Sequence, residues 1–540
     1  MSSRRTTVMG RIFGRRDESP METQPPPYDK DGPRFSPSGA SPAASRASLN
    51  TLPEVIENLG TGMYQVRTSL LAGPVWFADG AELILISSVS EVVSREWDFN
   101  ASQRGMVVTF VYLGVLVGNI LSGPFGDSFG RRLPILLSFL FIFVFSLCSA
   151  FSWGFWSLSF FRFCVGVSIG IGQPAQQALV SEVTPTKWRI IFTSIGQYLF
   201  SFGEVYSGFL VMADDPYMKD IHWRVLLIAG AVPSVIFGLA AFAFLKQSPL
   251  YLACGGRYEE TQEILESMRD DNSSPAVSID FRPHRVMCGG GGAQTNFGRL
   301  LRVVFGPDYA DTTCVLMSSC FVVNLAFYGS LYAFPNVMAG GVEIGSNPAM
   351  GLVLGGLMEM VGLTAGILCI LYFPRITVMR IYVLFMGSAL AAFAVGAPRQ
   401  STALMKFLTL YGYYGTKFFS VIGFLVFYLY ASEVYPTTVR TTGTSVVFAG
   451  GRLAAMLASL FYEWVTAACG NWAVFFYLMA VTCAANFVLT MLLTIETFGQ
   501  VLNDDEDEEE AEDACMEDAV GAKAFAYGSA EELADYGRKR

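Results

Sequence analysis

The sequence carries little charge for its length. Of its 540 residues, only 15% are Asp, Glu, Lys or Arg, whereas 52% are hydrophobic. A soluble protein carries about 25% charged residues, so this composition excludes an ordinary water-soluble fold. The 53 glycines agree with that conclusion, because Gly is more frequent in membrane helices than in soluble ones. The composition indicates an integral membrane protein.

Residues that carry enzymatic chemistry are also scarce. The chain has two histidines, so the G-x-S-x-G stretch at 126–130 lacks the setting of a hydrolase nucleophile. GIGQPA at 170–175 lies in an apolar segment with no preceding strand, which argues against a dinucleotide site. There is no G-x-x-x-x-G-K-[ST] motif for nucleotide hydrolysis and no C-x-x-C pair among the ten cysteines. We expect no enzyme activity, no cofactor, no metal site and no nucleic-acid partner.

Long apolar runs, by contrast, are abundant. About 20 apolar residues are needed for a helix to cross the hydrocarbon core of a bilayer. Twelve such segments are predicted, at about 69–89, 104–123, 133–152, 156–179, 190–212, 223–245, 313–338, 348–372, 377–396, 403–431, 441–466 and 472–495.

Three polar segments flank and divide these runs. The first is rich in Ser, Pro and Arg and buries too little to fold alone, and the last contains the acidic run NDDEDEEEAED. Within the first, PPPY at Pro25–Tyr28 is a possible ligand for a WW-type domain. The predicted organisation is a disordered N-tail (1–60), a six-helix half (61–246), a central loop (247–311), a second six-helix half (312–496) and an acidic tail (497–540).

Lys and Arg near the segment ends predict the orientation, because positive loops stay in the cytoplasm. With the basic central loop included, the balance favours cytoplasmic termini and a cytoplasmic central loop. We expect a multi-pass protein of the plasma membrane, with an intracellular vesicle membrane as the alternative.

One short motif occurs twice. SEVTPTKWR at Ser181–Arg189 and SEVYPTTVR at Ser432–Arg440 share six of nine residues and lie 251 positions apart. Each falls between the fourth and fifth apolar segment of its half. Two parallel six-helix repeats are the two halves of a major facilitator transporter. The repeat therefore predicts an internal duplication.

A second motif carries a resemblance to that superfamily. GPFGDSFGRR, from Gly123 to Arg132, fits the superfamily's G-x-x-x-D-x-x-G-R-R pattern. This likeness implies a cytoplasmic gating loop in which Gly123 allows close helix approach and Asp127 helps to hold the halves together. The second half has only LYFPRITVMR at 371–380 in this place, without Asp or Gly-Arg-Arg, so we expect asymmetric gating.

Further stretches resemble particular branches of the superfamily. QSPLYLACGGRYEE at 247–260 is similar to the run that follows helix six in sugar and organic-ion transporters, with Gln in place of the usual first Glu. WFADGAEL at 76–83 and Lys417, sixteen positions before Glu433, resemble the synaptic-vesicle-protein-like branch. The resemblance covers roughly residues 60–496. It implies an all-α membrane protein with twelve transmembrane helices in two pseudo-symmetric halves.

The gating residues follow from both motifs. Pro185 and Pro436 can open the next helix, where the missing N–H needs no partner. The acidic residue of each repeat then lies near the positive helix start, within reach of the arginine that ends the repeat. The predicted gating set is Gly123, Asp127, Gly130, Arg131, Arg132, Glu182, Arg189, Glu433 and Arg440.

Charged residues inside the apolar segments are the candidates for the transport path, because each costs at least about 2.5–3.5 kcal/mol to insert. Asp79 and Glu82 share one helix face, and Arg162 and Glu204 are expected to pair within the first half. The second half contributes Glu359, Lys417, Arg452 and Glu463. With added polar groups, the predicted substrate and proton path is Asp79, Glu82, Arg162, Glu204, Gln173, Asn324, Tyr328, Glu359 and Lys417.

These features predict a secondary transporter of a small polar organic solute, a sugar or an organic ion, working by alternating access. A desolvated carboxylate beside a basic residue can change protonation between two open states, so we predict proton symport. Uncoupled facilitated transport and a non-transporting receptor or scaffold are the alternatives. The acids suit a cationic or neutral solute and the bases suit an anion, so the sequence leaves the solute's charge open.

Overall fold

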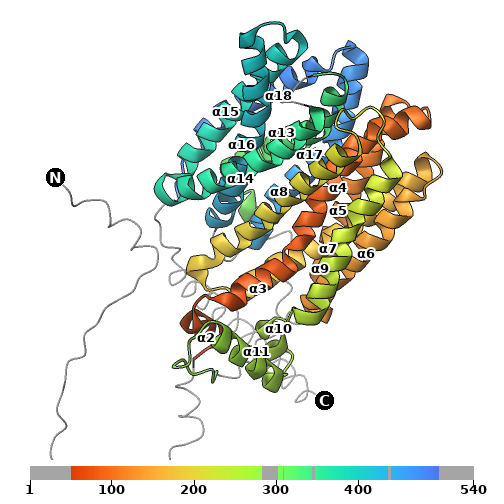
Figure 1. The fold of residues 1–540 in the computed structure, drawn as a ribbon. Helices are drawn as coiled ribbons and strands as arrows, with labels where there is room; N and C mark the ends of the chain where they lie inside the picture. Colours follow the sequence, from red (N-terminus) through yellow and green to blue (C-terminus); the bar gives the residue numbers. More distant parts are fainter. Residues whose placement is uncertain are drawn as a thin grey trace, which may run out of the picture. The chain divides into compact units, whose positions relative to one another are not determined.

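The computed structural model describes residues 50–281, 302–307, 309–342, 344, 347–435 and 440–497. Within these ranges the regular structure is helical, apart from one bridge between Asn50 and Phe281 (Figure 1). The motif at Pro25–Tyr28 and the acidic tail after Thr497 lie outside the described residues.

Six long helices form the N-terminal half. They are α4 (Pro74–Glu96), α5 (Ala101–Phe129), α6 (Arg132–Ala150), α7 (Phe155–Val183), α8 (Arg189–Asp214) and α9 (Trp223–Phe244). Helix α4 packs against α8, α5 against α7, and α6 against both α7 and α9.

Six more form the C-terminal half. They are α13 (Ala310–Ala339), α14 (Pro348–Tyr372), α15 (Arg375–Gly396), α16 (Ala403–Glu433), α17 (Arg440–Cys469) and α18 (Ala473–Leu489). Helix α13 packs against α17, α14 against α16, and α15 against both α16 and α18. Taken in chain order, each contact repeats one in the first half. The predicted fold of two six-helix halves is confirmed.

Eleven segments of the described residues are long and apolar enough to cross a membrane. The twelfth long helix, α8, has 26 residues but buries Ser201, Glu204 and Ser207, which lower its hydropathy. Large apolar side chains elsewhere face outward, for example Trp156 at 74% and Leu239 at 65% exposure. Such a surface is stable in lipid and not in water. The chain is a multi-pass integral membrane protein.

Three helix pairs make the main packing contacts between the halves: α4 with α13, α5 with α17, and α8 with α14. Because consecutive helices alternate in direction, their ends gather on two sides. We call the side where α9 ends and α10 begins the central-segment side. The side where α5 begins and α17 ends is the opposite side.

Four shorter helices accompany the N-terminal half: α2 (Leu52–Leu59), α3 (Met63–Ala72), α10 (Pro249–Cys254) and α11 (Tyr258–Asp271). Apolar residues of α2 and α11 share one buried cluster, and Arg67 of α3 pairs with Asp271 at 2.7 Å. We predicted a disordered tail up to residue 60 and a loop over 247–311. Helices form within both because their apolar faces cover one another, which neither segment reveals alone.

Glycines set the spacing between α5 and α7. A Cβ on Gly114 would lie 2.2 Å from the carbonyl oxygen of Phe163, and one on Gly166 would lie 2.0 Å from that of Val111. The predicted close approach at Gly123 is wrong, because no described atom lies within 4 Å of its Cβ position. Gly130 does need to be glycine: its φ is +81°, and a Cβ there would lie 2.2 Å from Gln247 Nε2.

Candidate functional site

Lys417 of α16 joins the two halves. Its Nζ lies 2.7 Å from Glu204 Oε2 on α8 and 2.7 Å from Glu359 Oε1 on α14. Ser201 of α8 donates a hydrogen bond of 3.1 Å to Glu359 Oε2. The exposed fractions of Glu204, Glu359 and Lys417 are 1%, 0% and 3%, so little water screens these charges. The structure thus brings three of the predicted path residues into one cluster.

The two carboxylates of this cluster share one ammonium as their cationic partner. Two acids beside one base leave one negative charge, which a proton on either carboxylate can neutralise. No described donor serves Glu204 Oε1. The cluster is therefore a carboxyl pair that shares one ammonium and has room for one proton.

Glu82 and Arg162 form a second buried pair, wholly inside the N-terminal half. The carboxylate of Glu82 on α4 contacts the guanidinium of Arg162 on α7 and accepts a hydrogen bond from Ser146 of α6. Arg162 Nε also donates to Ser149 Oγ at 3.0 Å. The predicted pairing of Arg162 with Glu204 is wrong, because Glu204 faces the C-terminal half from α8.

Asp79 lies one turn before Glu82 and has different partners. Gln173 Nε2 of α7 donates to Asp79 Oδ2 at 2.7 Å. Arg452 of α17 interacts electrostatically with Asp79 and with Tyr328 of α13. This interaction of Arg452 with Asp79 is long-range, because the described residues show no salt bridge between them.

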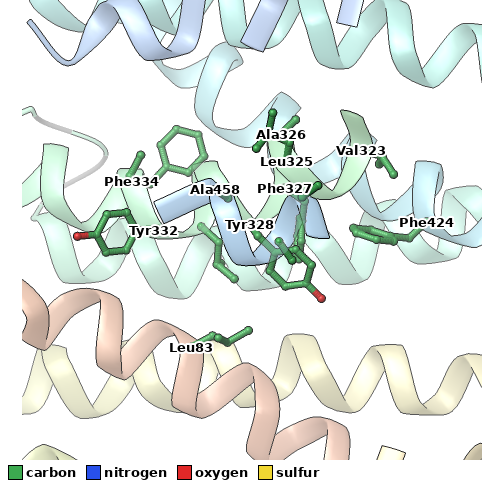
Figure 2. Close-up of a cluster of buried hydrophobic side chains, with 14 of the residues drawn as sticks. Leu83, Val323, Leu325, Ala326, Phe327, Tyr328, Tyr332, Phe334, Phe424 and Ala458 are labelled. Atoms are coloured by element: carbon green, nitrogen blue, oxygen red, sulfur yellow. The ribbon is translucent and has the colours of Figure 1, made fainter. Parts of the chain in front are cut away.

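Aromatic side chains of the C-terminal half lie beside these charges. The Phe327 ring centre is 5.8 Å from Lys417 Nζ and 5.1 Å from that of Phe424. Tyr328 meets Tyr112 of α5 edge-on, with 4.9 Å between ring centres. Figure 2 shows Tyr328 projecting from α13 towards the side on which α4 lies. The predicted polar residue Asn324 is buried, and its amide donates to Cys320 within α13.

The gating motif forms an ion-pair chain on the central-segment side. Arg131 Nη1 lies 2.7 Å from Asp127 Oδ1, and Arg131 Nε lies 3.1 Å from Glu182 Oε1. The predicted pairing of Glu182 with Arg189 is not found: Arg189 instead lines a cavity of about 300 Å³ beside Glu182. Arg132 turns away and donates to the carbonyl of Phe242.

Gln247 fastens this chain from the end of α9. Its Oε1 accepts hydrogen bonds from the backbone N–H groups of Arg131, at 3.0 Å, and Arg132, at 3.1 Å. These N–H groups start α6 and have no intrahelical acceptor. A neutral amide side chain thus caps the first turn of α6.

The second half repeats this arrangement with residues that the motifs did not reveal. Arg375 pairs with Glu433, with 3.3 Å between Arg375 Nε and Glu433 Oε2. This pair corresponds to that of Arg131 with Glu182. Glu496 accepts from the backbone N–H groups of Arg375 and Ile376, at 2.9 and 3.2 Å, as Gln247 does at α6. Glu433 also accepts from Thr497 at 2.7 Å. The side chain of Arg440 lies outside the described residues.

A further ion cluster closes the opposite side. Arg104 at the start of α5 is paired with Glu463 of α17 at 2.6 Å and with Glu91 of α4. Tyr332 of α13 donates to Glu463 Oε1 at 2.6 Å. From the sequence we named Glu463 as a candidate but assigned no site role to Arg104, Glu91 or Tyr332. The sequence gives little indication of a role for Arg104, because it lies at the end of an apolar segment, where Arg is common.

The fold and site together define a membrane transporter with two pseudo-symmetric halves and buried charges between them. A family model described as "Sugar (and other) transporter" matches residues 63–507. The chain belongs to this family, within the major facilitator superfamily.

Individual relatives are consistent with this family assignment. The chain is 26% identical over 473 residues to "Synaptic vesicle 2-related protein" of Xenopus laevis, covering 84% of this chain and 82% of that one. It is 24% identical over 489 residues to "Organic cation/carnitine transporter 7" of Arabidopsis thaliana, covering 84% and 96%. The solved xylose transporter XylE from E. coli matches with a TM-score of 0.65 and 16% identity, covering 81% and 100%. This structure supports the fold alone.

Proposed function

We propose that this transporter moves a small polar organic solute by alternating access and couples that movement to protons. The solute binds between the halves, near the middle of the membrane. The observation that carries the proposal is the cluster of Lys417, Glu204 and Glu359, which is buried, ionisable and divided between the halves.

Division between the halves is what makes coupling possible. When the halves rock apart, Lys417 and Glu359 move with one half and Glu204 with the other. A carboxylate that loses its ammonium partner in a dry environment holds a proton more readily. Protonation of Glu204 is thereby linked to which side of the transporter is open. Asp79 and Arg452 would act as a second divided pair.

The surface ion pairs fit the same cycle as gates. Arg104 and Glu463 join the halves on the opposite side. Asp127, Arg131 and Glu182 tie α5, α6 and α7 together on the central-segment side, and Arg375 with Glu433 does so for α15 and α16. Gating is then more symmetric than the motifs predict.

Orientation and location remain part of this proposal. We infer cytoplasmic termini from the basic central segment, which makes the Arg104 side extracellular or luminal. A plasma-membrane location stays our prediction. The relative named for synaptic vesicles supports an intracellular vesicle membrane as the alternative.

The sign of coupling depends on the charge of the solute. A neutral or anionic solute would travel together with the proton, as the sequence predicts, whereas a cation would take the proton's place. One relative is named for an organic cation and the family model for sugars and other solutes, so these names support a transporter role without selecting one solute class.

Uptake by purified protein in proteoliposomes, with and without a pH gradient, tests the proposal. We expect gradient-dependent uptake that is lost in Glu204→Gln and unchanged in Glu260→Gln, an exposed residue on α11. Uptake that ignores the gradient would support uncoupled transport. Binding of a solute without any uptake would support a receptor.

A further inference from the structure

Apart from the Arg104, Glu463 and Glu91 cluster on the opposite side, the buried charges between the helices do not balance. Three bases lie there: Arg162 on α7, Lys417 on α16 and Arg452 on α17. Four acids face them: Asp79 and Glu82 on α4, Glu204 on α8 and Glu359 on α14. The tyrosines nearby, Tyr112, Tyr328 and Tyr413, are neutral.

Two of the bases are paired directly with acids. Arg162 contacts Glu82, and Lys417 is shared by Glu204 and Glu359. Arg452 interacts at longer range with Tyr328 and with Asp79, so the charges of Arg452 and Asp79 offset each other. The surplus is one carboxylate, and it lies in the Lys417 cluster.

A surplus buried negative charge is costly unless a cation or a proton compensates it. Glu204 Oε1 receives no hydrogen bond from any described donor, so this oxygen is the acceptor that remains open. A proton on the carboxyl pair would restore neutrality in the resting state. An ammonium group in the same place would do so equally well.

The neighbouring rings suit the same ligand. Aromatic faces attract organic cations, and Phe327 already lies near the ammonium of Lys417. Phe327, Tyr328 and Phe424 form one group of rings with centres 5.1 to 6.3 Å apart. Benzenoid rings beside a surplus carboxylate favour a cation with apolar substituents over a hydroxyl-rich sugar.

Building on the proposed function, we infer that the solute is a monovalent organic cation that exchanges for one proton at Glu204 and Glu359. When the cation binds, the proton leaves the carboxyl pair, and the net charge of the cluster stays the same. When the cation departs on the other side, a proton returns. One positive charge moves each way, so the exchange is electroneutral.

Three labelled probes in proteoliposomes distinguish this from other solute classes: tetraethylammonium, benzoate and D-xylose. Potassium and valinomycin clamp the membrane potential, so that a pH gradient is the sole driving force. With an acidic interior, which drives exchange, we expect concentrative uptake of tetraethylammonium; with an acidic exterior, which would drive proton symport, we expect none of benzoate or xylose. Uptake of either of those two, without the cation, overturns the inference but leaves transport intact. No uptake of any probe by folded protein overturns both.

The substitution Glu204→Gln tests whether Glu204 is part of the exchange site. The neutral amide cannot exchange a proton and does not pair with a cation as a carboxylate does, so gradient-driven tetraethylammonium uptake should fall by about tenfold or more. Glu204→Asp should retain part of it, and Glu260→Gln all of it. Unchanged, pH-driven uptake in Glu204→Gln contradicts the assignment.

A binding measurement on the wild-type chain avoids reliance on variants that fold poorly. If proton and cation compete for one carboxyl pair, mass action raises the apparent Kd of tetraethylammonium by about tenfold per unit of falling pH once the pair is protonated. Equilibrium dialysis in detergent measures this. A Kd independent of pH, or one that falls with pH, overturns competition.

Discussion

The Lys417 ammonium lies 2.7 Å from Glu204 Oε2, and this contact crosses from the C-terminal half to the N-terminal half. Together with Glu359, it places an ion pair where conformational change must break and remake it. Because the contact is buried, removal of either partner should leave an uncompensated charge.

Replacing Lys417 with Met should destabilise the protein strongly. Removing one partner of a buried ion pair costs about 3–5 kcal/mol, because the other charge is left uncompensated. Here two carboxylates are left. Protons can neutralise them at acidic pH, so the loss of stability should be smaller there than at neutral pH. Thermal unfolding in detergent measures this, with the exposed Lys406→Met as control. Equal melting temperatures for the two variants would contradict the prediction.

A double variant refines this result. Adding Glu204→Gln to Lys417→Met removes one of the two unpaired charges. The double variant should be more stable than Lys417→Met alone, since residues in one ion pair couple by about 0.5–3 kcal/mol. Strict additivity of the two single effects would mean that the pair does not form in the membrane protein.

Arg104→Met should loosen the opposite side. Arg104 reaches Glu463 across the halves and Glu91 within its own half, so its loss leaves buried Glu463 without its cation. We expect a shift of the conformational equilibrium towards opening on that side. Arg95→Met is the matched control, because Arg95 pairs with the same Glu91 but does not reach α17.

Spin labels at Gln103 and Ala468, with the exposed Cys314 and Cys469 replaced, report this opening. Double electron–electron resonance should give a longer or broader distance distribution in Arg104→Met than in the parent protein. A distribution identical to that of Arg95→Met would show that the Arg104 pair does not hold the halves together.

Replacement by alanine should destabilise the protein at one glycine of α5 and have almost no effect at another. At Gly114 a Cβ meets the backbone of α7 at 2.2 Å, so the helices must move apart, at a cost of about 1–3 kcal/mol. At Gly123 the Cβ position is open among the described residues, so Gly123→Ala should leave the melting temperature almost unchanged. A larger loss at Gly123 than at Gly114 would refute this ranking, and with it the packing of α5 on α7.

Arg375→Gln should slow transport as much as Arg131→Gln does. Both arginines pair with the glutamate at the centre of the repeated SEV triplet, and both start a helix whose N–H groups are capped from a later segment. Initial uptake rates in proteoliposomes measure the effect, with the exposed Arg302→Gln as control. If Arg131→Gln is slow and Arg375→Gln matches the control, gating is asymmetric, as the motifs alone predict.

The membrane class and the duplicated halves follow from sequence because both rest on local features. Apolar runs near 20 residues need no partner to be recognised, and SEV-P-T-R repeated at 181 and 432 marks equivalent positions in the chain. The segment predicted at 348–372 coincides with α14, since Asn347 caps it and a helix break follows Tyr372.

The sequence could not assign ion-pair partners to the buried charged residues, because a charge in one helix can face any of several neighbouring helices. Asp79 and Glu82 share a helix face, yet one interacts with Arg452 and the other with Arg162. Arg162 was expected to meet Glu204 and does not. Only tertiary packing pairs Arg162 with Glu82 and places both Glu204 and Glu359 on Lys417, and the carboxylate left over is the basis of our proposal for a cationic solute.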